Sequence, residues 1–125
     1  MSVLIIEDDD GVRDSLVSIL REEGHVVEAV GNGKEALARL QQRPLPTLIL
    51  LDLMMPGMDG IHFRERQLAD AELRKIPVVI ISARPDIAWQ AARLRAAAVL
   101  RKPMSFEELL HVVQNRAVTE VGVPE

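Results

Sequence analysis

Short apolar runs alternate with stretches of helical periodicity along this chain. Three of the runs, at 3–6, 47–51 and 78–81, are continuous and aliphatic, which is typical of central β-strands buried on both faces. Two weaker runs, at 25–30 and 97–100, predict edge strands. Apolar residues repeat with a period near 3.6 and predict helices at about 12–20, 87–94 and 106–113. Gly31-Asn32-Gly33 and Pro44 mark the two ends of another helix, and a further helix is expected at about 60–69.

Capping residues support these helices. Asp9 and Asp10 are expected in the first turn of the first helix, where acidic side chains are favoured by the helix dipole. Gly24 marks the end of that helix. Ser105 and Glu108 have the spacing of a capping box for the last helix. The third helix is the least regular because its apolar residues are sparse.

Alternating strands and helices predict a mostly parallel sheet with right-handed crossovers. Five such units in 125 residues are best satisfied by a doubly wound α/β fold, a flavodoxin-like three-layer sandwich with strand order 2-1-3-4-5. In this order the first and third strands are neighbours at the topological switch point, where such sheets bind ligands. We expect the domain to span residues 1–118 and residues 119–125 to form a frayed tail.

The composition fits one small domain and excludes several classes. The chain is 48% hydrophobic but only 2% aromatic, so a sizeable core must be aliphatic. A net charge of −4 without a basic tail gives no basis for direct nucleic acid binding. The absence of cysteine excludes disulfides and thiolate metal sites. The first apolar run is too short for a signal peptide or membrane insertion. We therefore expect a cytoplasmic protein.

Acidic residues follow the two strands that the predicted order makes neighbours. Glu7 and Asp8 come directly after the first strand, and Asp52 follows the third, before the Pro/Gly turn at 55–60. Carboxylates held close together repel one another unless a cation compensates. Oxygen ligands without cysteine or clustered histidine favour Mg²⁺. A carboxylate beside Mg²⁺ can also attack a phosphoryl group and form an aspartyl phosphate.

Phosphoryl transfer needs a cation and a hydroxyl near the phosphoryl oxygens. Ser82 ends the fourth strand and Lys102 follows the fifth, next to Pro103. The ordered set Glu7-Asp8, Asp52, Ser82 and Lys102-Pro103, with the turn Met55-Pro56-Gly57-Met58-Asp59-Gly60, resembles the receiver domain of two-component response regulators. The resemblance extends from about residue 2 to residue 116.

The resemblance implies a site built around Asp52. Asp52 would accept a phosphoryl group from a phosphohistidine on a sensor histidine kinase or a phosphotransfer protein. Asp8 and Asp52 would bind Mg²⁺ directly, the backbone carbonyl of Met54 would be a third ligand, and Glu7 would contribute through water.

The resemblance also implies roles for Lys102 and Ser82. Lys102 would pair with Asp52 before reaction and contact the phosphoryl group afterwards, and Ser82 would hydrogen-bond a phosphoryl oxygen. The Lys102-Pro103 peptide is often cis in this family. Phosphorylation would repack the face formed by the fourth helix, fifth strand and fifth helix, which would bind a downstream protein. On this interpretation the chain is a signalling phosphoacceptor and not an enzyme.

This sequence departs from the family at several positions. Val99 stands where the family usually has an aromatic residue that reports phosphorylation to the surface. The stretch between Ser82 and Lys102 is about two residues short, and Arg95-Ala96-Ala97-Ala98 replaces the usual Gly-Ala. Met54 and Arg84 occupy positions that modulate dephosphorylation, and Met54 is expected to obstruct a hydrolytic water.

Two alternatives remain open at this point. A pseudo-receiver would keep the fold but act as an adaptor without phosphorylation, and Val99 with the shortened segment keeps this alternative alive. A phosphatase of the haloacid dehalogenase type also uses Asp and Mg²⁺ on an α/β sheet. That class would leave the Asp52 turn unexplained, since its two aspartates lie together after the first strand.

Overall fold

The computed structural model describes residues 2–53, 60–83 and 92–120, with side chains as far as residue 115. Its strands form one parallel sheet in the order β2-β1-β3-β4-β5, which confirms the predicted doubly wound topology. The strands are β1 (Ser2–Ile6), β2 (Val26–Val30), β3 (Leu48–Asp52), β4 (Val78–Ser82) and β5 (Ala98–Arg101).

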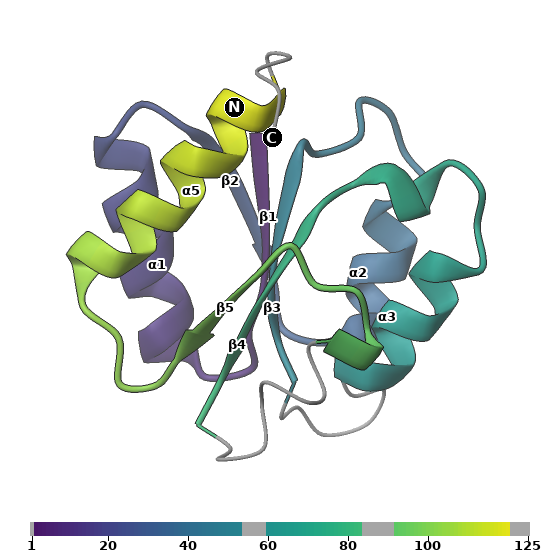
Figure 1. Ribbon diagram of the computed structural model, residues 1–125, viewed down its shortest axis with the longest axis horizontal. Coiled ribbons are helices and arrows are strands. Elements are labelled where there is room, and N and C mark those ends of the chain that lie inside the picture. The colour runs from purple at the N-terminus through teal and green to yellow at the C-terminus, as the bar shows by residue number, and fades with distance from the viewer. Residues whose placement is uncertain (1, 54–59, 84–91, 121–125) are drawn as a thin grey trace.

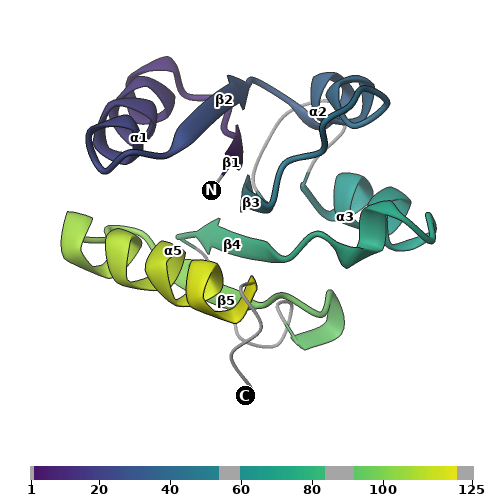
Figure 2. The ribbon, with the colours of Figure 1, turned by 90° about the horizontal axis from the view of Figure 1, so that it is seen from above.

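Helices cover both faces of the sheet (Figures 1 and 2). One face is covered by α1 (Asp10–Glu22) and α5 (Phe106–Glu120), and the other by α2 (Gly33–Arg39) and α3 (Gly60–Leu68). The predicted fourth helix falls mainly on residues outside the described ranges. Within the part of the chain that the structure describes, no helix is long and apolar enough to cross a membrane.

Successive residues of the central strands pack into two aliphatic layers. In β1, Leu4 and Ile6 contact the cluster that contains Phe63 of α3. Val3 and Ile5 point to the other face and contact the cluster of α1 and α5. Both faces of β3 are buried throughout, as the continuous apolar run predicted. Because the central strands are fixed on both faces, their carboxyl ends form a rigid edge.

Local capping explains where two of the helices begin. The Asp9 side chain accepts a hydrogen bond from the Val12 amide at 2.9 Å and forms the N-cap of α1. Ser105 and Glu108 satisfy one another's backbone amides at 3.1 and 3.2 Å, which confirms the predicted capping box of α5. Gly24 after α1 has φ 91°, a conformation that glycine adopts without strain.

Two further segments complete the described fold. The polar segment 70–75 contains a short 3₁₀ helix, η1 (Leu73–Lys75), because Leu73 turns inward and is buried in the core. Helix α5 continues to Glu120, two residues into the predicted tail, and residues 121–125 lie outside the described ranges.

Candidate metal centre

The carboxyl ends of β1 and β3 lie side by side at one edge of the sheet. In the parallel register Ile6 is paired with Leu51, so the residues that follow them, Glu7 and Asp52, lie at the same level at the end of their strands. The Glu7 amide continues the pairing with β2 by donating to the Val30 carbonyl at 3.1 Å. Sheet geometry therefore positions both carboxylates before any ligand is present.

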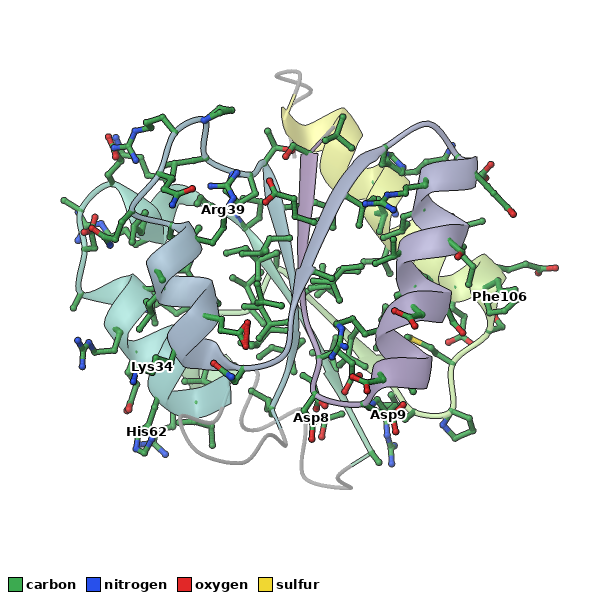
Figure 3. All side chains as sticks on the ribbon, turned by 180° about the vertical axis from the view of Figure 1, so that it is seen from behind. Asp8, Asp9, Lys34, Arg39, His62 and Phe106 are labelled. Carbon is green, nitrogen blue, oxygen red and sulfur yellow. The ribbon has the colours of Figure 1, made fainter. Side chains whose placement is uncertain are left out.

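Three carboxylates meet at this edge. Glu7, Asp8 and Asp52 each offer one oxygen, and these oxygens lie within 4.8 Å of one another. Glu7 and Asp52 are buried, whereas Asp8 is exposed. Figure 3 shows Asp8 beside Asp9 at the N-terminal end of α1, while Arg39 lies at the opposite end of the sheet. An oxygen-only site that is open on one side suits Mg²⁺, which retains several waters and needs few carboxylates.

Lys102 brings a positive charge to the same site. Its Nζ lies 3.2 Å from Glu7 Oε1 and 3.7 Å from Asp52 Oδ2. The sequence interpretation expected Asp52 as the partner of this lysine. The sequence did not predict the shorter contact to Glu7. Glu7 was expected to contribute to a metal site through water, and not to form an ion pair with Lys102.

The electrostatics of the site follow from this close packing. Burial raises the pKa of Glu7, and a hydrogen bond with Asp52 and the Asp52 charge raise it further, against the lowering effects of the Asp9 amide and Lys102. Burial lowers the pKa of Lys102, but the charges of Asp52 and Glu7 outweigh it and the net pKa is raised. Lys102 therefore stays protonated and balances part of the negative charge when no metal is bound.

Ser82 and Lys102 are linked through the backbone. Ser82 is the last residue of β4 and is buried, and its carbonyl accepts a hydrogen bond from the Lys102 amide at 3.0 Å. The Lys102-Pro103 peptide is cis, as the resemblance implied. A second cis peptide, Arg43-Pro44, was not predicted. Two residues singled out by the sequence, Met54 and Arg84, lie outside the described residues.

Arg13 is a residue of the site's surroundings that sequence reasoning missed. Its guanidinium donates to the Glu7 carbonyl at 3.0 Å and forms an ion pair with Asp10. The spacing of Asp10 and Arg13, three residues apart on one helix, was a signal for the ion pair. Nothing in the sequence indicated the contact with Glu7. Arg13 fixes the backbone that presents the acidic pair.

An open, mostly apolar groove adjoins the acidic site. It lies between α1 and the start of α5 and has a volume of about 780 Å³. Lys102 and Asp9 line it together with apolar residues of α1, of α5 and of the loop before α5, including Val12, Leu16, Met104 and Leu109. Phe106, also in its lining, is 63% exposed and is labelled in Figure 3 at the start of α5.

The fold and the site together define a doubly wound α/β protein with an acidic, lysine-containing centre at its topological switch point. Residues 3–114 match the family described as the response regulator receiver domain, and the chain belongs to this family.

Curated relatives support this membership. The response regulator Rre1 of Synechocystis sp. is 35% identical over 118 residues, which cover 92% of this chain and 51% of the relative. The sensory transduction protein RegX3 of Mycolicibacterium smegmatis is 36% identical over 123 residues, covering 97% of this chain and 51% of the relative. This chain thus spans about half the length of these two relatives.

Solved structures share the same architecture. The receiver domain of a signal transduction histidine kinase from Syntrophus aciditrophicus has a TM-score of 0.86 at 30% identity, covering 99% of this chain and 94% of its own. The chemotaxis protein CheY4 of Vibrio cholerae has a TM-score of 0.83 at 27% identity, covering 91% of this chain and 96% of its own.

Proposed function

We propose that this chain is a phosphoacceptor in two-component signalling that receives a phosphoryl group on Asp52. The convergence of Asp52 with Glu7, Asp8 and Lys102 at the end of a rigid sheet supports this proposal most strongly. An isolated surface aspartate would have neither the acidic partners nor the lysine. Membership of the receiver domain family also supports a role in phosphoryl transfer for this cluster.

The residues present fit a bound Mg²⁺. Asp8 and Asp52 would hold it directly with the Met54 carbonyl, and Glu7 would contribute through water. Mg²⁺ bound here would neutralise charge on the phosphoryl oxygens during transfer. The carboxylates alone would repel an incoming phosphoryl group, so the site depends on a cation for its chemistry.

The protein's own groups perform the remaining steps. A carboxylate oxygen of Asp52 attacks phosphorus, and the bond from phosphorus to the donor nitrogen breaks as the new oxygen–phosphorus bond forms. Lys102 moves from its carboxylate partners toward a phosphoryl oxygen, over a short path because its Nζ already lies 3.7 Å from Asp52. Ser82, at the end of the neighbouring strand β4, donates a hydrogen bond from its hydroxyl group to another phosphoryl oxygen.

The phosphodonor is a phosphohistidine of a sensor histidine kinase or a phosphotransfer protein. The apolar groove beside Lys102 supports binding of a protein donor there, since it places apolar surface next to the reacting group. Phe106 gives this surface an exposed aromatic side chain, of the kind that contributes strongly to protein interfaces. The output is a change in the face that includes β5 and α5, read by a downstream protein.

Phosphate uptake tests this proposal. The protein is mixed with Mg²⁺ and a small phosphodonor, and its intact mass is compared with that of Asp52→Asn. Asp9→Asn is the matched control, because asparagine also serves as an N-cap and the same charge is lost nearby. We expect one acid-labile phosphoryl group on the wild type and on Asp9→Asn, and none on Asp52→Asn.

Other outcomes separate the alternatives. Equal uptake by Asp52→Asn would remove Asp52 from its proposed role. No uptake by the folded wild type would favour the pseudo-receiver. Steady release of phosphate from a phosphomonoester would favour a phosphatase of the haloacid dehalogenase type.

A further inference from the structure

Arg64 is a buried cation on α3. Its exposed fraction is 3%, and among the described residues its guanidinium donates to amide oxygens and to no carboxylate. Nε donates to the Leu94 carbonyl at 2.9 Å, and Nη2 to the Arg95 carbonyl at 3.0 Å. Nη1 donates to Gln67 Oε1 at 2.7 Å. A buried charge is costly unless its hydrogen bonds are well made, so this arrangement calls for a structural reason.

Gln67, one turn further along α3, extends the network to η1. Its amide is completely buried and donates to the Leu73 carbonyl at 2.9 Å and to the Ile76 carbonyl at 3.1 Å. Arg64 and Gln67 therefore connect three segments, which are α3, the turn at Leu94 and Arg95, and the end of η1. Apart from the bond between Arg64 and Gln67, each of these contacts satisfies a backbone carbonyl that would otherwise need another donor.

The turn at Leu94 and Arg95 receives two of the hydrogen bonds of Arg64. Ala92 and Arg93 are helical, and the Arg95 amide donates to the Ala92 carbonyl at 3.2 Å. Arg95 has φ 56°, the left-handed conformation in which a helix usually ends on glycine. Here arginine adopts it, and the carbonyls of the helix end are satisfied by the fork of Arg64.

The chain enters the sheet directly after this turn. The Ala97 amide donates to the Val78 carbonyl at 2.8 Å, and β5 begins at the next residue. Leu94 itself is buried in the core cluster that contains Phe63 of α3. The turn thus lies directly before the start of β5.

We propose that Arg64 is a positioning residue that anchors the Leu94–Arg95 turn to α3 and thereby fixes the point at which β5 enters the sheet. A guanidinium suits this task because its planar fork holds two carbonyls and one amide oxygen in fixed directions. Without it, the turn would depend on a strained arginine alone.

Site-resolved amide hydrogen exchange tests the anchor in the unphosphorylated protein. In Arg64→Met we expect the Arg95 and Ala97 amides to exchange about tenfold faster, the size expected for a lost hydrogen bond to a charged group. The Lys102 amide, at the far end of β5, should change much less. Arg66→Met is the matched control, since Arg66 is exposed on the same helix and should leave both ends unchanged.

Two further variants distinguish anchoring from general stability. Arg64→Lys keeps the charge but loses the fork, and should also accelerate exchange at the turn. Adding Arg95→Gly to Arg64→Met should return the Ala97 amide toward the wild-type rate, because glycine tolerates the left-handed conformation. Equal acceleration at all amides, or no acceleration at Arg95 and Ala97 in either Arg64 variant, would overturn the anchor.

Discussion

A methyl group at Gly60 would separate the start of α3 from the end of β3. A Cβ at this position would lie 2.5 Å from the carbonyl oxygen of Asp52 and 2.6 Å from Cα of Leu53. Both are backbone atoms of a buried strand end, so no flexible side chain can move aside. Overpacking of a filled interior costs about 1–3 kcal/mol. We expect Gly60→Ala to lower the free energy of unfolding by about 2–3 kcal/mol, since the two closest contacts are with backbone atoms.

Gly11 provides the control in another helix. A Cβ there would meet only Asp9 Oδ1, at 3.4 Å, and the position is exposed in the first turn of α1. Alanine is favoured over glycine within helices by up to about 1 kcal/mol. Gly11→Ala should therefore leave stability unchanged or raise it by about 0.5 kcal/mol.

Urea unfolding followed by far-ultraviolet circular dichroism measures both effects. The wild type and the two variants are compared at one pH, with the midpoint and the slope of each transition determined. Equal changes in the two variants, or a loss below about 0.5 kcal/mol in Gly60→Ala, would refute the close packing of α3 on the strand that carries Asp52.

Three other substitutions probe the site and its scaffold. Lys102→Met should slow phosphate uptake about a hundredfold, as for loss of one charge-stabilising donor, and uptake at the wild-type rate would contradict the role of this lysine. Met54→Asn should shorten the lifetime of the phosphorylated protein, and an unchanged rate of phosphate loss would refute the obstruction. The hydrogen bond from Arg39 lowers the pKa of Glu28 below 4.5. The folded state then binds fewer protons than the unfolded state, so this stabilisation is present above pH 4.5 and is lost as the pH falls through the lowered pKa. Because the Glu28 side chain is half-exposed, the pH-dependent part should be below about 1 kcal/mol. Arg39→Met should flatten the pH dependence of unfolding free energy in this range, and an unchanged slope would exclude the pair as its source.

Features that depend on neighbouring residues in the chain could be predicted from the sequence. The apolar runs located all five strands to within one residue. The three central runs are continuous because strands buried on both faces leave no polar alternation. The capping box of Ser105 and Glu108 was predictable because its partners are three residues apart. The acidic cluster could be predicted because parallel topology brings successive strand ends to one edge.

Contacts that depend on exact packing could not be predicted. Arg64 and Gln67 stand on a helix whose sparse apolar pattern gave no sign that two polar side chains point inward. Apart from their bond to each other, their partners are backbone carbonyls up to 31 residues away, which any sequence supplies. The nearer contact of Lys102 to Glu7 depends on a few tenths of an ångström between two carboxylates. Such distances are set by the folded sheet and not by spacing along the chain.

Chemical location of the phosphoryl group tests the role of Asp52 most directly. After exposure to Mg²⁺ and a small phosphodonor, borohydride reduces an aspartyl phosphate to an alcohol, and peptide mass mapping identifies the reduced residue. We predict reduction of Asp52 alone, dependent on both Mg²⁺ and the phosphodonor. Reduction at Asp8 or at any other carboxylate, with Asp52 intact, would contradict the assignment of Asp52 as the phosphoacceptor.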